Sequence, residues 1–301
     1  MKLSLNKLNI GILLSFISYS CFAFMDVVNK FLFSSVNISF FSYMFWLDLA
    51  ILITLFAIGF FKSSLSLTIF KTKKPIGVFF RSLFSLGNTL CSLVAISHLP
   101  FHIFYSLTFM QPIIATLLSI VLFIEKPNFK KISLILFGFI GVMISIELWN
   151  MQNSTLSFIG IIAGLGVALT GALSGVVVKK YLPEENTVTV AIYNILLSIL
   201  VACGYFTFVN EGLYLTGNIK TIILIALGGI LAGLGMIFFM MSYQKASVQS
   251  IVSMQYIQII WGALFGFLLF SNIPSIYAII GIAIIIISNY INIKLVSGKV
   301  G

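Results

Sequence analysis

The stretch YSCFAFMDVVNKFL, residues 19–32, places an acid and a base within a long apolar segment. Asp26 and Lys30 are four residues apart, so on a helix they share one face. A weaker copy, SGVVVK, occurs at residues 174–179, which is 149 positions after MDVVNK at residues 25–30. The copy keeps the lysine but has glycine in place of the aspartate. The two stretches predict a duplicated protein whose halves have diverged in function.

The composition excludes an ordinary soluble domain. Hydrophobic residues make up 60% of the 301 residues, charged residues make up 8%, and the mean hydropathy is +1.16. Ten apolar stretches approach the roughly 20 residues that a helix needs to cross a bilayer. They are too long for barrel strands and do not alternate, so we expect an all-α membrane protein with ten transmembrane helices. The predicted spans are residues 9–33, 39–61, 75–97, 103–124, 132–148, 157–178, 188–209, 219–241, 248–270 and 276–291.

The basic residues predict the orientation of the chain. With ten helices both termini lie on one side of the membrane, and that side carries 15 of the 17 lysines and arginines. Of the other two, Lys220 lies on the opposite side and Lys30 lies within the first helix. Because basic loops tend to stay in the cytoplasm, we expect a multi-pass protein of the bacterial inner membrane with both termini cytoplasmic. The net charge of +10 then reflects topology and contacts with the lipid bilayer, not a nucleic-acid partner.

A second internal match gives nearly the same displacement. Gln111-Pro112, followed by FIEKP at residues 123–127, aligns with Gln258-Ile259, followed by FSNIP at residues 270–274, 147 positions later. Five helices separate the copies, and an odd number reverses the direction of every repeated helix. We therefore expect two inverted-topology five-helix repeats, as in secondary transporters whose binding site lies between the repeats near mid-membrane. The predicted repeats are residues 1–149 and 150–301.

The whole chain resembles the drug/metabolite transporter superfamily, specifically the EamA-like ten-helix transporters. The residues that carry the resemblance are Phe24-Met25-Asp26-x-x-x-Lys30, Arg81 opening the third helix, AISHLP at residues 95–100, Gln111-Pro112, and Glu125-Lys126 before Gly138-x-x-Gly141. The pairing of Asp26 with Lys30 is most similar to the branch of S-adenosylmethionine and riboflavin uptake carriers. The resemblance implies transport of a small organic metabolite, such as S-adenosylmethionine or an amino acid with a cationic or zwitterionic group.

Three charged residues within predicted spans are candidate substrate contacts: Asp26, Lys30 and Asp48. Ionised groups inside a bilayer are unfavourable and normally face the bundle interior or water. A cationic substrate group could compete with Lys30 for Asp26. The alternative for these two is a structural pair in which Lys30 extends toward the outer surface. Asp48 could couple transport to protons, contact substrate, or pair with Lys30 or Arg81.

Polar and aromatic residues at helical spacing are the other candidates for a substrate cavity. The amides Gln111 and Gln258 occupy equivalent positions in the two repeats. Amides can also join neighbouring helices, and aromatic rings can serve packing or an interfacial belt instead of stacking on a planar substrate. The predicted cavity residues are Asn88, Tyr105, Thr108, Gln111, Gln255, Tyr256, Gln258 and Trp261.

A further set is assigned to helix packing or gating. Glycines four residues apart allow close helix approach, and no strand or polar turn accompanies them as a phosphate loop would require. The set comprises Arg81, Pro112, Gly171, Gly175, Gly229, Gly233, Gly262 and Gly266. No motif for a metal or a cofactor is present, so we expect neither.

The leading interpretation is a carrier for a small-molecule substrate that works by alternating access. Its direction, its coupling to protons or to a counter-substrate, and its state as monomer or homodimer are left open. An exporter of amino acids or drugs with the same fold is the first alternative. A membrane-embedded enzyme or a channel is a weaker one, because no nucleophile–base set is apparent and both histidines, His98 and His102, lie in one outer loop.

Overall fold

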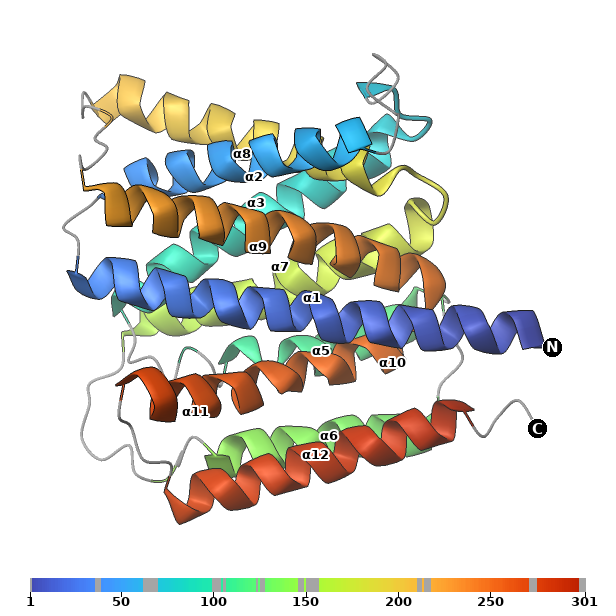
Figure 1. The fold of residues 1–301 in the computed structure, drawn as a ribbon. Coiled ribbons are helices and arrows are strands. Elements are labelled where there is room, and N and C mark those ends of the chain that lie inside the picture. The colour runs from blue at the N-terminus through green and yellow to red at the C-terminus, as the bar shows by residue number, and fades with distance from the viewer. Residues whose placement is uncertain are drawn as a thin grey trace.

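The computed structural model describes residues 2–35, 39–61, 70–98, 104, 107–122, 124, 128–145, 149, 157–209, 213, 218–270 and 275–297. All the regular structure in these ranges is helical (Figure 1). The helices are α1 (Lys2–Ser35), α2 (Phe40–Phe61), α3 (Pro75–His98), α5 (Gln111–Val121), α6 (Phe129–Ser145), α7 (Phe158–Tyr181), α8 (Thr187–Val209), α9 (Ile219–Lys245), α10 (Val248–Val252), the 3₁₀ helix η3 (Ser253–Tyr256), α11 (Ile257–Phe270) and α12 (Ile276–Ser297).

These helices fall on the ten predicted spans. Five of them contain stretches long and apolar enough to cross a membrane: Asn9–Asn29, Phe40–Gly59, Phe158–Tyr181, Thr187–Val209 and Ile219–Lys245. Exposed side chains along α3 include Ile76, Phe79 and Phe80, which water would not favour but which hydrocarbon chains would cover. The prediction of an all-α, multi-pass membrane protein is confirmed.

The helix pairs of one half reappear in the other half. The two most extensive contacts join α1 to α9 and α3 to α7, and a shift of five helices converts one pair into the other. The pair α2–α9 corresponds in the same way to α8–α3, and α1–α11 corresponds to α7–α5. The pairs α2–α8 and α6–α12 are their own counterparts, and Figure 1 shows α6 and α12 side by side at one edge. This pairing confirms a two-repeat architecture.

Contacts at one end of the bundle show that the repeats run in opposite directions. Gly11, near the start of α1, lies against Ala246, just after α9. Gly77, at the start of α3, lies against Leu182, just after α7. Lys179 of α7 donates a hydrogen bond to the carbonyl of Ala246, so all these helix ends share one side. We call it the terminal end, because α1 begins there and α12 ends there (Figure 1). α1 therefore leaves the terminal end, whereas its counterpart α7 runs toward it.

Glycines place the helices of the two halves in close contact. A Cβ atom added to Gly229 of α9 would lie 2.4 Å from the Cβ of Ala50 in α2, and one added to Gly233 would lie 3.1 Å from Thr54. Gly171 of α7 is similarly crowded by Gln111 of the first half, and Gly175 is crowded by Tyr243 of α9 in its own half. These four glycines lie at close approaches between helices, and the assignment to packing or gating stays a prediction.

Gly262 is different from those four glycines. It is exposed, and no described heavy atom lies within 4 Å of an added Cβ. No described helix packs against Gly262, and its assignment to packing or gating stays a prediction. Gly266 lies one turn later in α11, and its surroundings are outside the described structure.

We expect Gly229→Ala to lower the free energy of unfolding by about 1–3 kcal/mol, the usual range for overpacking. The added methyl group meets not only the side chain of Ala50 but also its carbonyl carbon, 2.9 Å away, and backbone cannot move aside cheaply. The matched control is Gly262→Ala, which adds the same methyl group in open space. Thermal unfolding of both purified variants measures the difference, and equal melting temperatures would contradict this packing.

Candidate functional site

The fourth and ninth predicted spans are both interrupted near the middle of the bundle. In the fourth span, Phe109 and Met110 form a turn before α5 begins at Gln111, where Pro112 fits because the first helical turn needs no backbone N–H donor. In the ninth span, the 3₁₀ helix η3 separates α10 from α11. The displacement of 147 positions maps Phe109 onto Tyr256, the last residue of η3. The interruptions are therefore equivalent positions of the two repeats.

The two interrupted spans lie against each other. The rings of Phe109 and Tyr256 have centroids 6.1 Å apart, and α10 packs against α5. In η3 the hydroxyl of Ser253 donates to the carbonyl of Ser250, a side-chain bond that competes with regular helical hydrogen bonding. Discontinuous helices in corresponding positions of two halves are the feature that marks the binding site of secondary transporters.

Three amides meet beside this crossing, and we call Asn88, Gln111 and Gln255 the central amide cluster. A Cβ atom on Gly171 would lie 2.5 Å from the Oε1 atom of Gln111 and 3.0 Å from the Nδ2 atom of Asn88. Gln255 Nε2 donates to Gln111 Oε1 over 3.5 Å. The glycine thus leaves the room that the amides occupy, and the four elements α3, α5, α7 and η3 each supply one residue.

The hydrogen bonds of the cluster differ in strength. Asn88 Nδ2 donates to the carbonyl of Val167 over 2.8 Å, which anchors this amide to α7. The 3.5 Å bond between Gln255 and Gln111 is at the outer limit of hydrogen-bond length. The Oε1 atom of Gln255 is buried and has no partner among the described residues. The two glutamines therefore keep donor and acceptor capacity that a polar ligand could use.

A second polar group, which we call the acidic group, consists of Asp26, Tyr43 and Asp48. Tyr43 of α2 lies within electrostatic range of both carboxylates and its hydroxyl donates to Asn29 of α1. Asp48 is buried and accepts a 2.6 Å hydrogen bond from Ser198 of α8. Asp26 is half-buried on α1 and has no hydrogen-bond partner among the described side chains.

The partner of Asp48 differs from those considered on sequence grounds. The described contact is with the hydroxyl of Ser198, not with Arg81, and the side chain of Lys30 lies outside the described structure. A hydroxyl satisfies the carboxylate without adding a charge. Neither Ser198 nor Tyr43 belongs to a sequence motif that would have pointed to this group. The contact between α2 and α8 could be expected, because the two helices are equivalent in the two repeats.

The remaining predicted cavity residues are dispersed. Tyr256 is fully buried, with its ring against Gly138 and its hydroxyl donating to the carbonyl of Ile135, so its contacts are those of helix packing and not of an open cavity. Trp261 donates from Nε1 to Ser20 over 2.8 Å and so joins α11 to α1.

Two further predicted cavity residues, Thr108 and Gln258, do not join the central amide cluster. Thr108 bonds the carbonyl of Phe104 in its own span. Gln258 is half-buried on α11, and Tyr105 lies outside the described residues.

At the terminal end, side-chain hydrogen bonds to backbone carbonyls join two helix ends, which the sequence analysis did not predict. Lys179 Nζ donates to Ala246 over 2.6 Å, and Gln244 Nε2 donates to Leu182 and Glu185 over 2.8 and 2.9 Å. We call these bonds the terminal latch. They tie the end of α7 to the end of α9, where carbonyls without helical partners attract cations.

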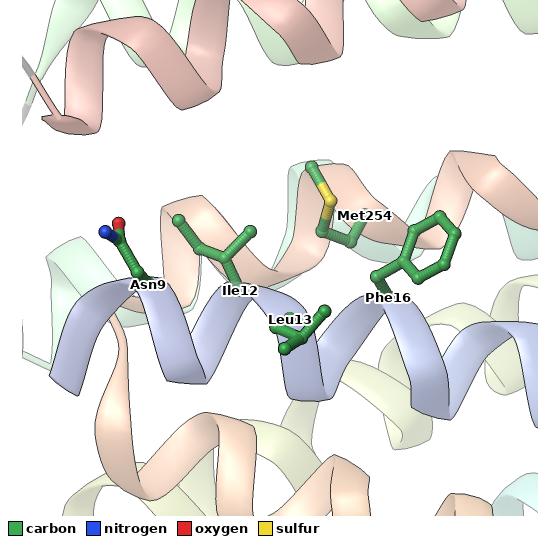
Figure 2. A pocket seen from close by; sticks show the side chains of 5 residues that line it. All are labelled: Asn9, Ile12, Leu13, Phe16 and Met254. Carbon is green, nitrogen blue, oxygen red and sulfur yellow. The ribbon is translucent and has the colours of Figure 1, made fainter. Parts of the chain in front are cut away.

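One open hollow lies beside α1 (Figure 2), and no residue of the central amide cluster or the acidic group lines it. It has a volume of about 340 Å³ and is lined by Asn9, Ile12, Leu13, Phe16 and Met254. A single amide among apolar side chains offers little to a polar metabolite. Among the described residues, no three His, Cys, Asp or Glu side chains gather where they could hold a metal ion.

Comparisons with known proteins agree with this architecture. The sequence profile of the EamA-like transporter family matches residues 9–146 and 158–293, once in each half. No curated protein matches the chain. A solved structure, described only as a crystal structure of protein, has a TM-score of 0.82 and 14% sequence identity, and the match covers 97% of this chain and 99% of that one. At this identity the likeness shows the fold alone.

We expect a double-mutant cycle between Asp48→Asn and Ser198→Ala to give a coupling energy of about 0.5–3 kcal/mol, the range for residues in direct contact. The matched control pairs Asp48→Asn with Ser82→Ala. The Ser82 hydroxyl is also buried but has no partner in the described structure, so that cycle should be additive. Unfolding free energies of the purified variants give both values. Equal coupling in the two cycles would show that the bond to Ser198 contributes nothing specific.

Proposed function

Because the chain belongs to the EamA-like transporter family, a family of membrane transporters of small molecules, we propose that it is a secondary transporter of a small organic metabolite. It works by alternating access between the two inverted five-helix halves. The observation that carries the proposal is the crossing of the two interrupted spans, where Gln111 and Gln255 meet beside Gly171. Membrane proteins tolerate interrupted helices only where protein or a cavity satisfies the freed backbone groups.

The acidic group supports a substrate with a cationic or zwitterionic character. Asp26 is half-buried and unpartnered among the described residues, whereas Asp48 is held by Ser198. An intramembrane carboxylate requires a cation, water or a proton. A primary amine or a sulfonium, as in an amino acid or S-adenosylmethionine, would supply the cation. A proton on the same carboxylate would couple transport to the proton gradient.

The terminal latch supports a state in which access from the terminal end is closed. Opening that end requires Lys179 to release the carbonyl of Ala246 and Gln244 to release those of Leu182 and Glu185. Each bond joins a side chain to a carbonyl, so a shift of α9 relative to α7 breaks all of them together. We place the terminal end in the cytoplasm of a bacterial cell, from the distribution of lysines.

Counterflow in proteoliposomes tests the function. Vesicles loaded with an unlabelled candidate are diluted into the same labelled compound, with lysine, methionine and S-adenosylmethionine as the first three probes. A carrier accumulates label transiently because the outward flow of unlabelled substrate drives exchange. Uptake that never exceeds simple equilibration would indicate a channel. Turnover of a probe into a new product would indicate an enzyme.

We expect Gln111→Leu to lower transport about tenfold, the effect of removing one substrate hydrogen bond of roughly 1.4 kcal/mol. Gln258→Leu is the matched control: it is the same substitution at the equivalent position of the other repeat, but Gln258 lies outside the central amide cluster. Its transport should fall less than about twofold. Initial rates and melting temperatures of both variants separate substrate contact from helix packing. Equal rates in both variants would remove Gln111 from the substrate site.

A further inference from the structure

Arg81 is the only arginine in the chain, and the other 16 basic residues are lysines. It is 3% exposed, and its neighbours Val78 and Ser82 are buried to the same extent. The adjoining residues Phe79 and Phe80 are exposed. The guanidinium is therefore on the inner face of α3, and the lipid-facing side of that helix is apolar.

Among the described residues, no acidic side chain pairs with the guanidinium of Arg81. Its Nε and Nη1 atoms are buried without a hydrogen-bond partner among the described residues. Arginine stays protonated in proteins, so burial cannot be relieved by loss of a proton, and an unpaired buried charge is strongly unfavourable. Lys179, also at the terminal half of the bundle, contrasts with it because its amine is bound to the carbonyl of Ala246.

The position of Arg81 relates it to the central amide cluster. Asn88 lies seven residues later on the same face of α3, about 10 Å along the helix axis. Because α3 and α7 are antiparallel, with Gly77 beside Leu182 and Gly87 beside Thr170, Arg81 is level with the second turn of α7 after Gly171, near Val176–Val178. Gln255 Oε1, also buried and unpartnered among the described residues, belongs to the same cluster. An anion site and a neutral hydrogen-bonding site thus lie along one interior face.

We propose that Arg81 binds a carboxylate of the transported molecule while the central amide cluster holds an adjoining polar group. The proposal rests on the transport function proposed above and adds the class of substrate, an organic acid or zwitterion. A planar guanidinium matches both oxygens of a carboxylate, which a lysine amine does not. A phosphate dianion would call for a second cation, and the amine of Lys179 is already bound to a carbonyl.

The competing assignment is an internal ion pair. Of the acidic side chains, Asp48 is bound to Ser198 and Glu185 accepts from the backbone of Lys73. Glu125, which follows α5 in the sequence, lies outside the described residues. An ion pair between Arg81 and Glu125 would make the guanidinium a stabilising group. A substrate site makes it a destabilising one until ligand arrives, so the two assignments predict opposite effects of its removal.

The first experiment uses the purified full-length protein with sodium benzoate as the probe and benzamide, its neutral isostere, as the control. We expect benzoate to raise the melting temperature of the wild type and benzamide to leave it unchanged. Arg81→Gln should raise the melting temperature without ligand and abolish the response to benzoate. Lys179→Gln is the matched control: loss of a paired cation should lower the melting temperature and leave the benzoate response intact. A fall in the melting temperature of Arg81→Gln, restored by adding Glu125→Gln, would establish the ion pair and overturn the proposal.

A second measurement uses the fact that the chain has a single arginine. Phenylglyoxal modifies arginine, so intact-mass spectrometry of the wild type follows one adduct. At a benzoate concentration of about twice its Kd, the adduct should form about threefold more slowly, because a third of the protein remains free. Equal rates with benzoate and benzamide, or stronger protection by inorganic phosphate, would overturn the carboxylate assignment. Both measurements report binding without transport, so absent counterflow would defeat the proposed function and leave this site standing.

Discussion

A hydrocarbon core that offers no hydrogen bonds is the constraint on which this structure depends. It restricts the chain to helices, which satisfy their own backbone groups, and it allows interrupted helices only where protein surrounds them. Both described interruptions, at Phe109–Met110 and at η3, meet this condition because they lie against each other. The same constraint gathers polar side chains there. Asn88 bonds a backbone carbonyl of α7, and the hydroxyl of Ser253 bonds one of its own span.

The scaffold is symmetric but its chemistry is not. Helix pairs such as α1–α9 and α7–α3 are equivalent, so the same kind of helix contact occurs once for each repeat. The contacts of the polar residues do not repeat in this way. Gln111 contacts Gln255 and not Gln258, which is its equivalent in the second repeat. Carboxylates are confined to α1 and α2 of the first half among the described spans, and a serine of α8 bonds one of them. The packing of the two halves therefore follows the repeat, whereas the polar side chains inside the bundle do not.

The sequence predicted most of the fold because the signal for each span is long and redundant. The displacement of 147 between Gln111-Pro112 and Gln258-Ile259 also relates the two interruptions to each other, although the sequence analysis did not predict that either span is interrupted. The site was harder to predict. A polar residue within a predicted span indicates that its side chain needs a partner, but it does not indicate which residue that partner is. The carboxylate of Asp48 accepts a hydrogen bond from Ser198. No described heavy atom lies within 4 Å of a Cβ added to Gly262. Which partner is chosen depends on the rotation of each helix about its axis, and apolar residues on nearly every face leave that rotation unspecified.

The charges left inside the bundle impose a direction on whatever binds there. Asp48 lies two turns from the start of α2, which is at the end opposite the termini, whereas Arg81 lies two turns from the start of α3 at the terminal end. The two carboxylates thus lie toward one end and Arg81 toward the other, and Lys30, whose side chain is outside the described structure, follows Asp26 by one turn. In a medium of low dielectric constant such a separation is only weakly screened. Under the proposed function, a zwitterion would lie with its cationic group toward the acidic group and its anionic group toward Arg81.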